Sequence, residues 1–393
     1  MKLNNIHKSY IARFLRDLSF FGAVTIPYFL DWLNVDYTKI FLLQAWFSLW
    51  VIVLEIPTGV VADRYGRKIS VALGTLFFAI DLLIFGLTKN YYFLYLAEFI
   101  GALGFTLISG ADKALIYDSL IEMKKKEEGK HYLSRYEAAG TLGVLISFPL
   151  GSFIVGNNLI EYPAALPLTF ILSSISLTLA FFVYLSIKEP KRHVPAENFV
   201  KSGIGGLKYL NKNKALRAFA INSALISAIT FFMFWFYQPL SASAGINITY
   251  YGLIGAGFNL FQIILLFNTK RLENMFGVRT ILFYSALIPS VLFIGLAITK
   301  NVYFVILGIF LIAGSRFRIP ILSDFMNQHI ESKNRATVLS SISLMERIVI
   351  AVLYPIIGYL TDISLNYALI FLGVLALIFT FVTIIEESSL VSS

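Results

Sequence analysis

The chain has no cysteine and little charge. Of its 393 residues, 14% are Asp, Glu, Lys or Arg and four are His, whereas an average soluble domain carries roughly 25% charged residues. The absence of cysteine excludes disulfides, thiolate metal sites and iron–sulfur clusters. We expect no cofactor and no metal site, and the shortage of charge argues against a water-soluble protein.

The chain contains many long runs of apolar residues. Hydrophobic residues make up 58% of the chain, and its mean hydropathy is +0.76. A helix needs about 20 mostly apolar residues to cross a hydrocarbon layer of about 30 Å. Runs of this length predict an all-α membrane protein with twelve transmembrane helices. The predicted spans are residues 14–33, 38–62, 69–88, 91–118, 136–155, 164–187, 215–244, 249–269, 278–299, 302–322, 336–360 and 366–385.

The net charge of +9 lies in alternate loops. This spread argues against a nucleic-acid partner, because a protein that binds nucleic acid usually gathers its basic residues on one face or in one tail. Cytoplasmic loops carry an excess of Lys and Arg, so the sequence predicts a multi-pass protein of the cell (plasma or inner) membrane with both termini cytoplasmic. The opposite connections hold few bases, chiefly Lys39, Lys89 and Lys300. The basic loops are residues 66–68, 124–131, 188–193, 208–214, 269–271 and 332–335.

A long polar interruption divides the chain into two halves. We predict six-helix bundles at residues 1–188 and 214–393, joined by a cytoplasmic linker at residues 189–213 that carries one short amphipathic helix. The halves resemble each other: DRYGRK and NMFGVRT place Gly66 and Gly277 at the same turn between the second and third span of each half. Such pseudo-symmetric repeats are typical of transporters that bind substrate between their halves.

The loop after the second span resembles a known signature. The matching residues are Gly59, Asp63, Arg64, Gly66, Arg67 and Lys68. They resemble the G-x-x-x-D-R-x-G-R-K loop of the major facilitator superfamily. The resemblance implies two six-helix bundles and a gate in which Asp63 faces the start of the eleventh helix, while Arg64 or Arg67 pairs with Asp118. The alternative is that these bases only fix orientation and that Gly66 only forms a turn.

Ionisable residues inside the apolar runs are candidate functional groups, because charge is costly in a membrane. Glu55, Glu98 and Asp112 are candidate proton-coupling residues. Asp81 could be either a proton site or a member of a buried ion pair. Glu55 could instead form an ion pair that only braces the first half. Arg13 and Asp17, one helical turn apart, are predicted to form a structural pair.

Candidate substrate-cavity residues combine aromatic faces with polar tips and a few deep charges. Such groups suit an amphipathic guest, although packing, an interfacial belt or structural ion pairs would use the same residue types. The candidates are Asp31, Trp235, Tyr237, Gln238, Asn259, Gln262, Arg316, Arg318 and Glu346.

The resemblance and the repeat together predict a secondary active transporter. We expect it to move a small amphipathic or lipophilic molecule by alternating access, as proton-coupled efflux. The alternative is uptake or facilitated diffusion of a small metabolite, anionic if Arg316 and Arg318 bind it. The expected partners are this substrate, protons and membrane lipids, and the chain is expected to be a monomer. Metalloprotease, phosphate-loop and serine-nucleophile motifs are absent from the sequence, which argues against an enzyme.

Overall fold

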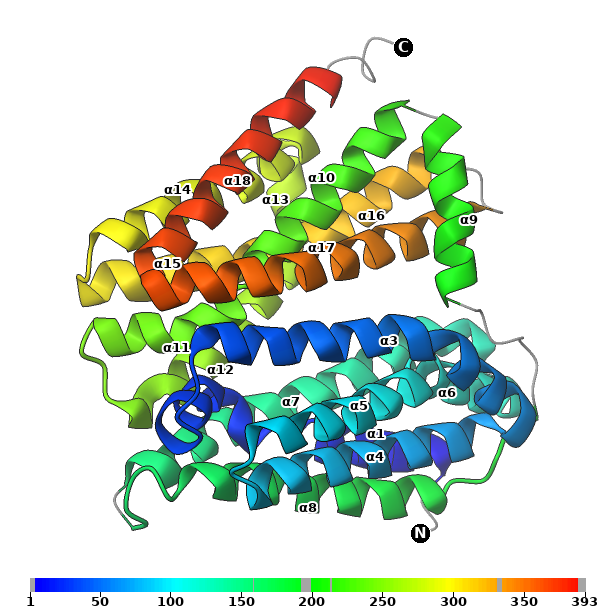
Figure 1. Cartoon of the computed structure of the whole chain (residues 1–393). Coiled ribbons are helices and arrows are strands. Elements are labelled where there is room, and N and C mark those ends of the chain that lie inside the picture. The colour runs from blue at the N-terminus through cyan, green and yellow to red at the C-terminus, as the bar shows by residue number, and fades with distance from the viewer. Residues whose placement is uncertain (1–3, 158, 192–198, 213, 331–333, 388–393) are drawn as a thin grey trace. The chain divides into compact units, whose positions relative to one another are not determined.

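The computed structural model describes residues 4–157, 159–191, 199–212, 214–330 and 334–387. Within these ranges every regular element is a helix (Figure 1). Ten helical segments of this part of the chain are long and apolar enough to cross a membrane, and Leu365–Phe381 adds a shorter one. With the interrupted first segment, these make the twelve spans expected from the apolar runs, and the all-α fold class is confirmed.

The chain packs as two compact units. Unit 1 comprises Met1–Val35, Trp46–Asn198 and Ile248–Ala256. Unit 2 comprises Asp36–Ala45, Phe199–Asn247 and Gly257–Ser393.

Unit 1 holds the first six spans apart from the start of α3. Its helices are α1 (Asn5–Arg16), η1 (Phe20–Ala23), α2 (Thr25–Pro27), η2 (Tyr28–Trp32), α3 (Tyr37–Tyr65), α4 (Arg67–Leu87), α5 (Tyr91–Ile108), α6 (Ala111–Glu122), η3 (Lys126–Glu128), α7 (Gly129–Gly156), α8 (Leu166–Leu185) and η4 (Ile248–Tyr250).

Unit 2 holds the helix that follows the linker and the last six spans apart from the start of α12. Its helices are α9 (Phe199–Lys212), α10 (Lys214–Phe231), α11 (Met233–Ser243), α12 (Tyr251–Phe267), α13 (Thr269–Phe276), α14 (Val278–Ile298), α15 (Val302–Gly314), η5 (Ser315–Phe317), α16 (Arg318–His329), α17 (Arg335–Ile363) and α18 (Leu365–Glu387).

Equivalent turns recur in the two halves. Gly66 and Gly277 both have positive φ, +107° and +77°, and each precedes a helix directly. Asn90 and Asn301 cap α5 and α15 in the same way: the side-chain oxygen of each accepts a backbone N–H two residues on, at 3.0 and 3.1 Å. The same number of residues separates the members of each pair, so the predicted internal repeat extends to backbone conformation.

The first span differs from its prediction as one helix over residues 14–33. α1 ends at Arg16, and the chain continues through short 3₁₀ and π turns. The backbone N–H groups of Ser19 and Phe20 donate to the hydroxyls of Ser147 and Ser173, each at 2.9 Å. Backbone that leaves a helix at membrane depth needs such partners, and hydropathy does not register them.

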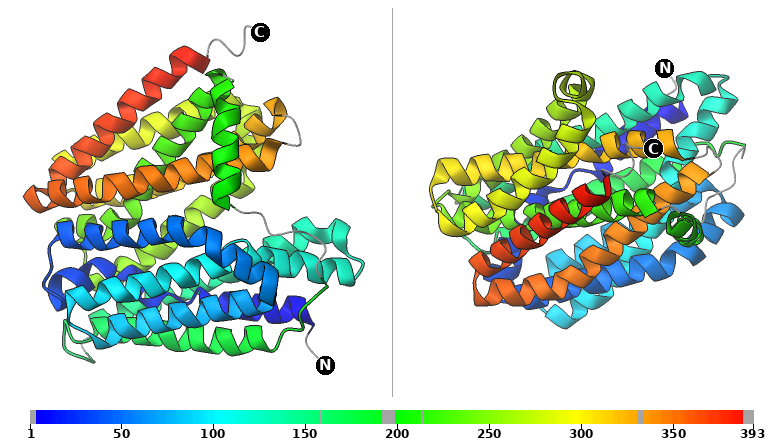
Figure 2. Two further views of the ribbon diagram at one scale, coloured as in Figure 1. Left: turned by 45° about the vertical axis from the view of Figure 1, so that its right-hand side comes forward. Right: turned by 90° about the horizontal axis from the view of Figure 1, so that it is seen from above.

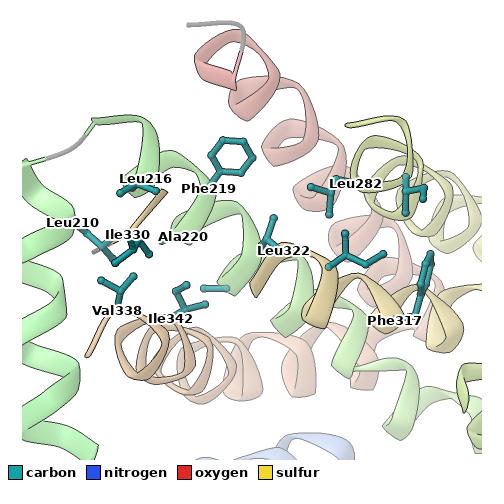
Figure 3. Packing of buried hydrophobic residues seen from close by; sticks show 13 residues of the cluster. Leu210, Leu216, Phe219, Ala220, Leu282, Phe317, Leu322, Ile330, Val338 and Ile342 are labelled. Atoms are coloured by element: carbon teal, nitrogen blue, oxygen red, sulfur yellow. The ribbon is translucent and has the colours of Figure 1, made fainter. Parts of the chain in front are cut away.

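A buried apolar cluster holds unit 2 together. Leu210 of α9, Phe219 of α10, Leu282 of α14, Leu322 of α16 and Val338 of α17 meet in it (Figure 3). This cluster anchors the helix that follows the linker to the helices of its own unit.

The expected linker helix is α9, which crosses α17 near the N-terminal end of α17 (Figures 1 and 2). A Cβ at Gly206 would overlap both the Ser341 hydroxyl and the Thr337 carbonyl oxygen. Only glycine permits this approach, because it has no methyl group to meet those atoms.

Candidate functional site

Among the residues that the structure describes, helix breaks interrupt four spans: the first, fourth, seventh and tenth. The breaks lie after Arg16, at Gly110 between α5 and α6, at Phe232 between α10 and α11, and at η5 between α15 and α16. Gly110 has a φ of +72°, a conformation that glycine adopts readily. Discontinuous helices expose backbone groups that bind substrates and ions in transporters. The polar candidates therefore need to be placed relative to these breaks.

Arginines of α1 balance acidic side chains at the breaks of the first and fourth spans. Arg16 Nη2 lies 3.0 Å from Asp112 Oδ2, and Tyr136 donates its hydroxyl hydrogen to the same oxygen at 2.9 Å. The predicted pair of Arg13 and Asp17 is confirmed, with Nε and Oδ2 3.0 Å apart. Asp112, a predicted proton-coupling residue, thus has arginine as its partner.

The same network reaches α7. Glu137 accepts Arg13 Nη2 at 3.1 Å and Lys113 Nζ at 2.9 Å. The adjacent residues Asp112 and Lys113 have different partners in the network: Asp112 is buried and pairs with Arg16, whereas Lys113 is exposed and pairs with Glu137. Three cations and three carboxylates therefore balance one another on α1, α6 and α7.

Glu55 lies at the break of the fourth span. The Ser109 hydroxyl donates to Glu55 Oε1 at 3.0 Å, and the Glu55 residue is 8% exposed. Ser109 directly precedes Gly110, so the carboxylate of α3 is tied to the residue at which α5 ends. A change in the charge of Glu55 would act directly on this break.

Asp81 and Glu98 form a buried acidic pair on α4 and α5. Both residues are buried, and the charge of Glu98 acts on Asp81. A Cβ on Gly101, one turn after Glu98, would lie 2.6 Å from Asp81 Oδ2. Asp81 Oδ1 has no hydrogen-bond partner among the described residues. Two buried acidic side chains on neighbouring spans make this a candidate functional position, because charge within a membrane is costly.

The turn at Gly66 assembles around Glu189, a residue that follows the sixth span. The Glu189 carboxylate accepts the backbone N–H groups of Arg67 and Lys68, at 2.8 and 2.9 Å, and so caps α4. A Cβ on Gly66 would lie 2.9 Å from the Glu189 carboxyl carbon. Both the positive φ and the closeness of this carboxylate therefore require glycine here.

Arg67 is the arginine of the turn that meets Asp118. Its Nη1 lies 2.5 Å from Asp118 Oδ2 and donates to the Ala114 carbonyl oxygen at 2.9 Å. Arg64 is exposed and lies over the Tyr65 ring. Lys68 is half-buried, and a Cβ at Gly59 would meet no atom within 4 Å. The side chain of Asp63 lies outside the part of the chain that the structure describes.

A charged pair in unit 2 lies beside aromatic rings. Arg316 Nη2, in η5, is 3.3 Å from Glu346 Oε1, in α17, and the two side chains are 25% and 20% exposed. Arg316 also donates to the Ser227 carbonyl oxygen at 2.9 Å and lies 5.8 Å from the centre of the Phe231 ring. The pair therefore joins the break of the tenth span to the seventh and eleventh spans.

The rings next to this pair form an aromatic cluster of Phe41, Phe231, Phe232, Trp235 and Tyr354. Phe41 stacks on Tyr354 with ring centres 5.6 Å apart, and Trp235 meets the edge of Phe41, also at 5.6 Å. Trp235 is 6% exposed, and its Nε1–H has no acceptor among the described residues. The cluster thus offers apolar faces and one buried donor beside an ion pair.

The remaining candidates lie in varied surroundings. Tyr237 and Gln238 are buried, and Asn259 and Gln262 are half-buried. Arg318 is buried and donates to Asn222 Oδ1 at 2.8 Å. Asp31 is exposed and accepts the Tyr162 hydroxyl.

Sequence reasoning missed Ser109, Glu137, Glu189 and Tyr354. The first three act through partners far along the chain, which no local pattern marks. Tyr354 carried a signal, since LYPIIG around it resembles SFPLG of the fifth span.

Comparisons with known proteins agree with one family. The family model of the Major Facilitator Superfamily matches residues 9–243 and 223–389. Multidrug resistance protein 1 of Bacillus subtilis (strain 168) is 24% identical over 354 residues, covering 88% of this chain and 86% of that protein. Multidrug resistance protein 2 of the same organism is 27% identical over 185 residues, covering 45% and 44%.

Solved structures share the fold at low sequence identity. A mutant of the nucleoside transporter NupG superposes with a TM-score of 0.83 at 13% identity, covering 98% of this chain and all of that chain. A bacterial homologue of the human lysosomal transporter Spinster, in an inward-facing and occupied conformation, gives 0.77 at 15% identity, covering 98% and 96%.

Proposed function

This chain belongs to the major facilitator superfamily, and we propose that it exports a small amphipathic or lipophilic molecule by alternating access in exchange for protons. It is a multi-pass membrane transporter. The similarity to a multidrug resistance protein along most of both chains supports export. The distribution of basic loops supports an orientation in the cell membrane with both termini cytoplasmic.

The observation that carries the proposal is the Arg316–Glu346 pair beside the aromatic cluster. A charge within a membrane span is costly and usually functional. Here the pair is partly exposed at the break of a span, and the rings next to it suit an apolar or cationic guest. The Nε1–H of Trp235 adds a donor for a polar tip.

Exchange follows from competition for Glu346. In the described state Arg316 balances its carboxylate at 3.3 Å. A proton on Glu346 would remove that balance, and a cationic substrate would compete with both Arg316 and the proton. Two ligands that cannot hold one carboxylate together are coupled negatively, and this coupling is reciprocal. Such competition is the minimum requirement for antiport.

In unit 1, Glu55 and the Asp81–Glu98 pair are the further candidates for proton binding. We propose a lesser role for Asp112, because Arg16 and Tyr136 hold its carboxylate. The turn formed by Gly66, Arg67, Asp118 and Glu189 is proposed as a rigid part of the cytoplasmic gate, with Asp63 as the residue that engages the other half.

The test uses proteoliposomes with an imposed pH gradient and a fluorescent lipophilic cation. Antiport predicts accumulation of the cation in the more acidic compartment, because it moves against the proton flow. Glu346→Gln should lower this accumulation by about 5- to 150-fold, the usual range of coupling between sites. Glu161→Gln, which changes an exposed glutamate outside the spans, should leave it unchanged.

Three results would contradict the proposal. Accumulation in the basic compartment would indicate uptake with protons. Equilibration that ignores the gradient would indicate facilitated diffusion. Equal accumulation by Glu346→Gln and the unchanged chain would show that Glu346 does not couple substrate to protons.

A further inference from the structure

Unit 2 contains an apolar cavity of about 380 Å³. Its walls come from α12, α13, α14, α15 and η5, with Phe261, Leu265, Ile288, Leu311 and Phe317 among the lining residues. Its volume falls in the range of ordinary ligand sites, about 300–1,000 Å³. None of the groups proposed above for protons or substrate lines it.

The cavity offers hydrocarbon and almost no hydrogen bonding. The Ser285 and Ser315 hydroxyls that line it donate to carbonyl oxygens of their own helical segments, at 3.0 Å to Leu282 and 2.6 Å to Ile312. Their hydrogen atoms are therefore already used. An apolar space of this kind does not hold water well, so its natural occupant is an apolar chain.

Part of the cavity wall is exposed at the surface of unit 2. Tyr284 and Ile288 of α14 line it and are 50% and 41% exposed. Both belong to a span, so this exposed surface lies at the depth of the lipid chains. A ligand can enter sideways from the membrane without crossing water.

Basic residues stand at one end of the cavity. Leu272 and Phe276 place one side of α13 on its wall, while Lys270 and Arg271 of the same helix are exposed. Arg279, also exposed, directly precedes the lining residue Thr280. The basic loops predict that this end is cytoplasmic, and the cytoplasmic leaflet is rich in anionic lipids.

We propose that the cavity binds an acyl chain of an anionic phospholipid of the cytoplasmic leaflet, whose phosphate lies against Lys270, Arg271 and Arg279. The apolar cavity and the three basic residues lie side by side. A purely apolar molecule would not use the basic residues, and a cationic substrate would be repelled by them. The bound chain reaches Ser315 and Phe317, which flank Arg316 in η5. The lipid thus contacts the break of the tenth span next to Arg316.

The test measures binding without transport, so it stands apart from the proposed export. The full chain is placed in nanodiscs with phosphatidylglycerol that carries a photoreactive acyl chain, and the labelled peptides are mapped. Labelling is expected on α12, α14 and η5, and should be weaker with the matching phosphatidylcholine probe.

Two variants and a matched control locate the site. Changing Lys270, Arg271 and Arg279 together to Gln should lower labelling on the order of tenfold or more. Ser285→Leu should lower it by filling the cavity. Changing Lys124, Lys126 and Lys130 to Gln removes the same charge from exposed positions in unit 1 and should leave labelling unchanged.

Equal labelling by both probes, or labelling that survives loss of the three bases, would overturn the headgroup assignment. Displacement of the probe by the lipophilic cation would assign the cavity to substrate, and would overturn the lipid proposal.

Discussion

Arg67 and Asp118 form a buried ion pair, with side-chain exposures of 4% and 0%. Removing one partner leaves an uncompensated charge, so Arg67→Met or Asp118→Leu alone should destabilise the protein by about 3–5 kcal/mol. The double variant should recover most of this loss, because apolar side chains can replace a buried pair. Thermal unfolding of the purified protein in detergent measures both effects.

Transport by the double variant separates two roles of the pair. If the pair contributes to the gate, transport stays impaired although stability returns. Full recovery of transport together with stability would reduce the pair to a structural brace.

The Glu189 cap predicts a local stability effect. Glu189→Ala removes the acceptor of the Arg67 and Lys68 N–H groups and should cost about 0.5–2 kcal/mol, the usual value of an N-cap. Glu189→Gln keeps one side-chain oxygen and should cost less. Glu127→Ala, an exposed position in η3, is the matched control. Equal unfolding temperatures for Glu189→Ala and Glu127→Ala would contradict the cap.

Because Gly101 lies against Asp81, a larger side chain at position 101 should destabilise the protein only while the Asp81 side chain is present. Gly101→Ala places a methyl group 2.6 Å from Asp81 Oδ2 and should destabilise by about 1–3 kcal/mol. Adding Asp81→Ala should relieve this clash. Gly59→Ala has open space around it and should be neutral or gain up to about 1 kcal/mol from helix propensity. Equal unfolding temperatures for Gly101→Ala and Gly59→Ala would contradict the predicted clash.

Asp36 predicts a small loss of stability in acid. Partial burial opposes its ionisation, but hydrogen bonds from the Lys39 side chain and backbone outweigh this and lower the pKa of Asp36 below its ordinary 3.8. A lowered pKa contributes stability that is complete above the ordinary value and is lost as pH falls through the folded value. Asp36→Asn should therefore flatten the acid limb of the stability profile. An unchanged acid limb would contradict this role.

The sequence predicted the spans and the turns but not the breaks within spans. Length and hydropathy suffice for the spans because the membrane imposes them, and Gly66 and Gly277 are marked by their place in the repeat. The breaks depend on distant partners: Ser147 and Ser173 satisfy the backbone after α1, and no window around Ser19 contains them.

Some ion pairs could be predicted from local sequence spacing, and others could not. Arg13 and Asp17 are one turn apart on α1, so their pair follows from local geometry. Glu346 was a candidate from its depth alone, whereas its pairing with Arg316 needs the packing of α17 against η5, which is a tertiary fact. Asp31 stays a predicted cavity residue; its hydrogen bond from Tyr162 joins residues far apart in the sequence, and no local pattern predicts it.

Alternating access is tested most directly by two single cysteines on α3, which the natural absence of cysteine makes possible. Thr38→Cys marks the start of α3, where Asp362 of α17 accepts the backbone N–H groups of Tyr37 and Thr38, each at 2.8 Å, and Gly59→Cys marks the opposite end. Their reactivity with a membrane-impermeant thiol reagent is followed as the pH gradient and substrate are changed. We predict that one reactivity rises whenever the other falls. Reactivities that rise and fall together, or do not respond, would contradict the account.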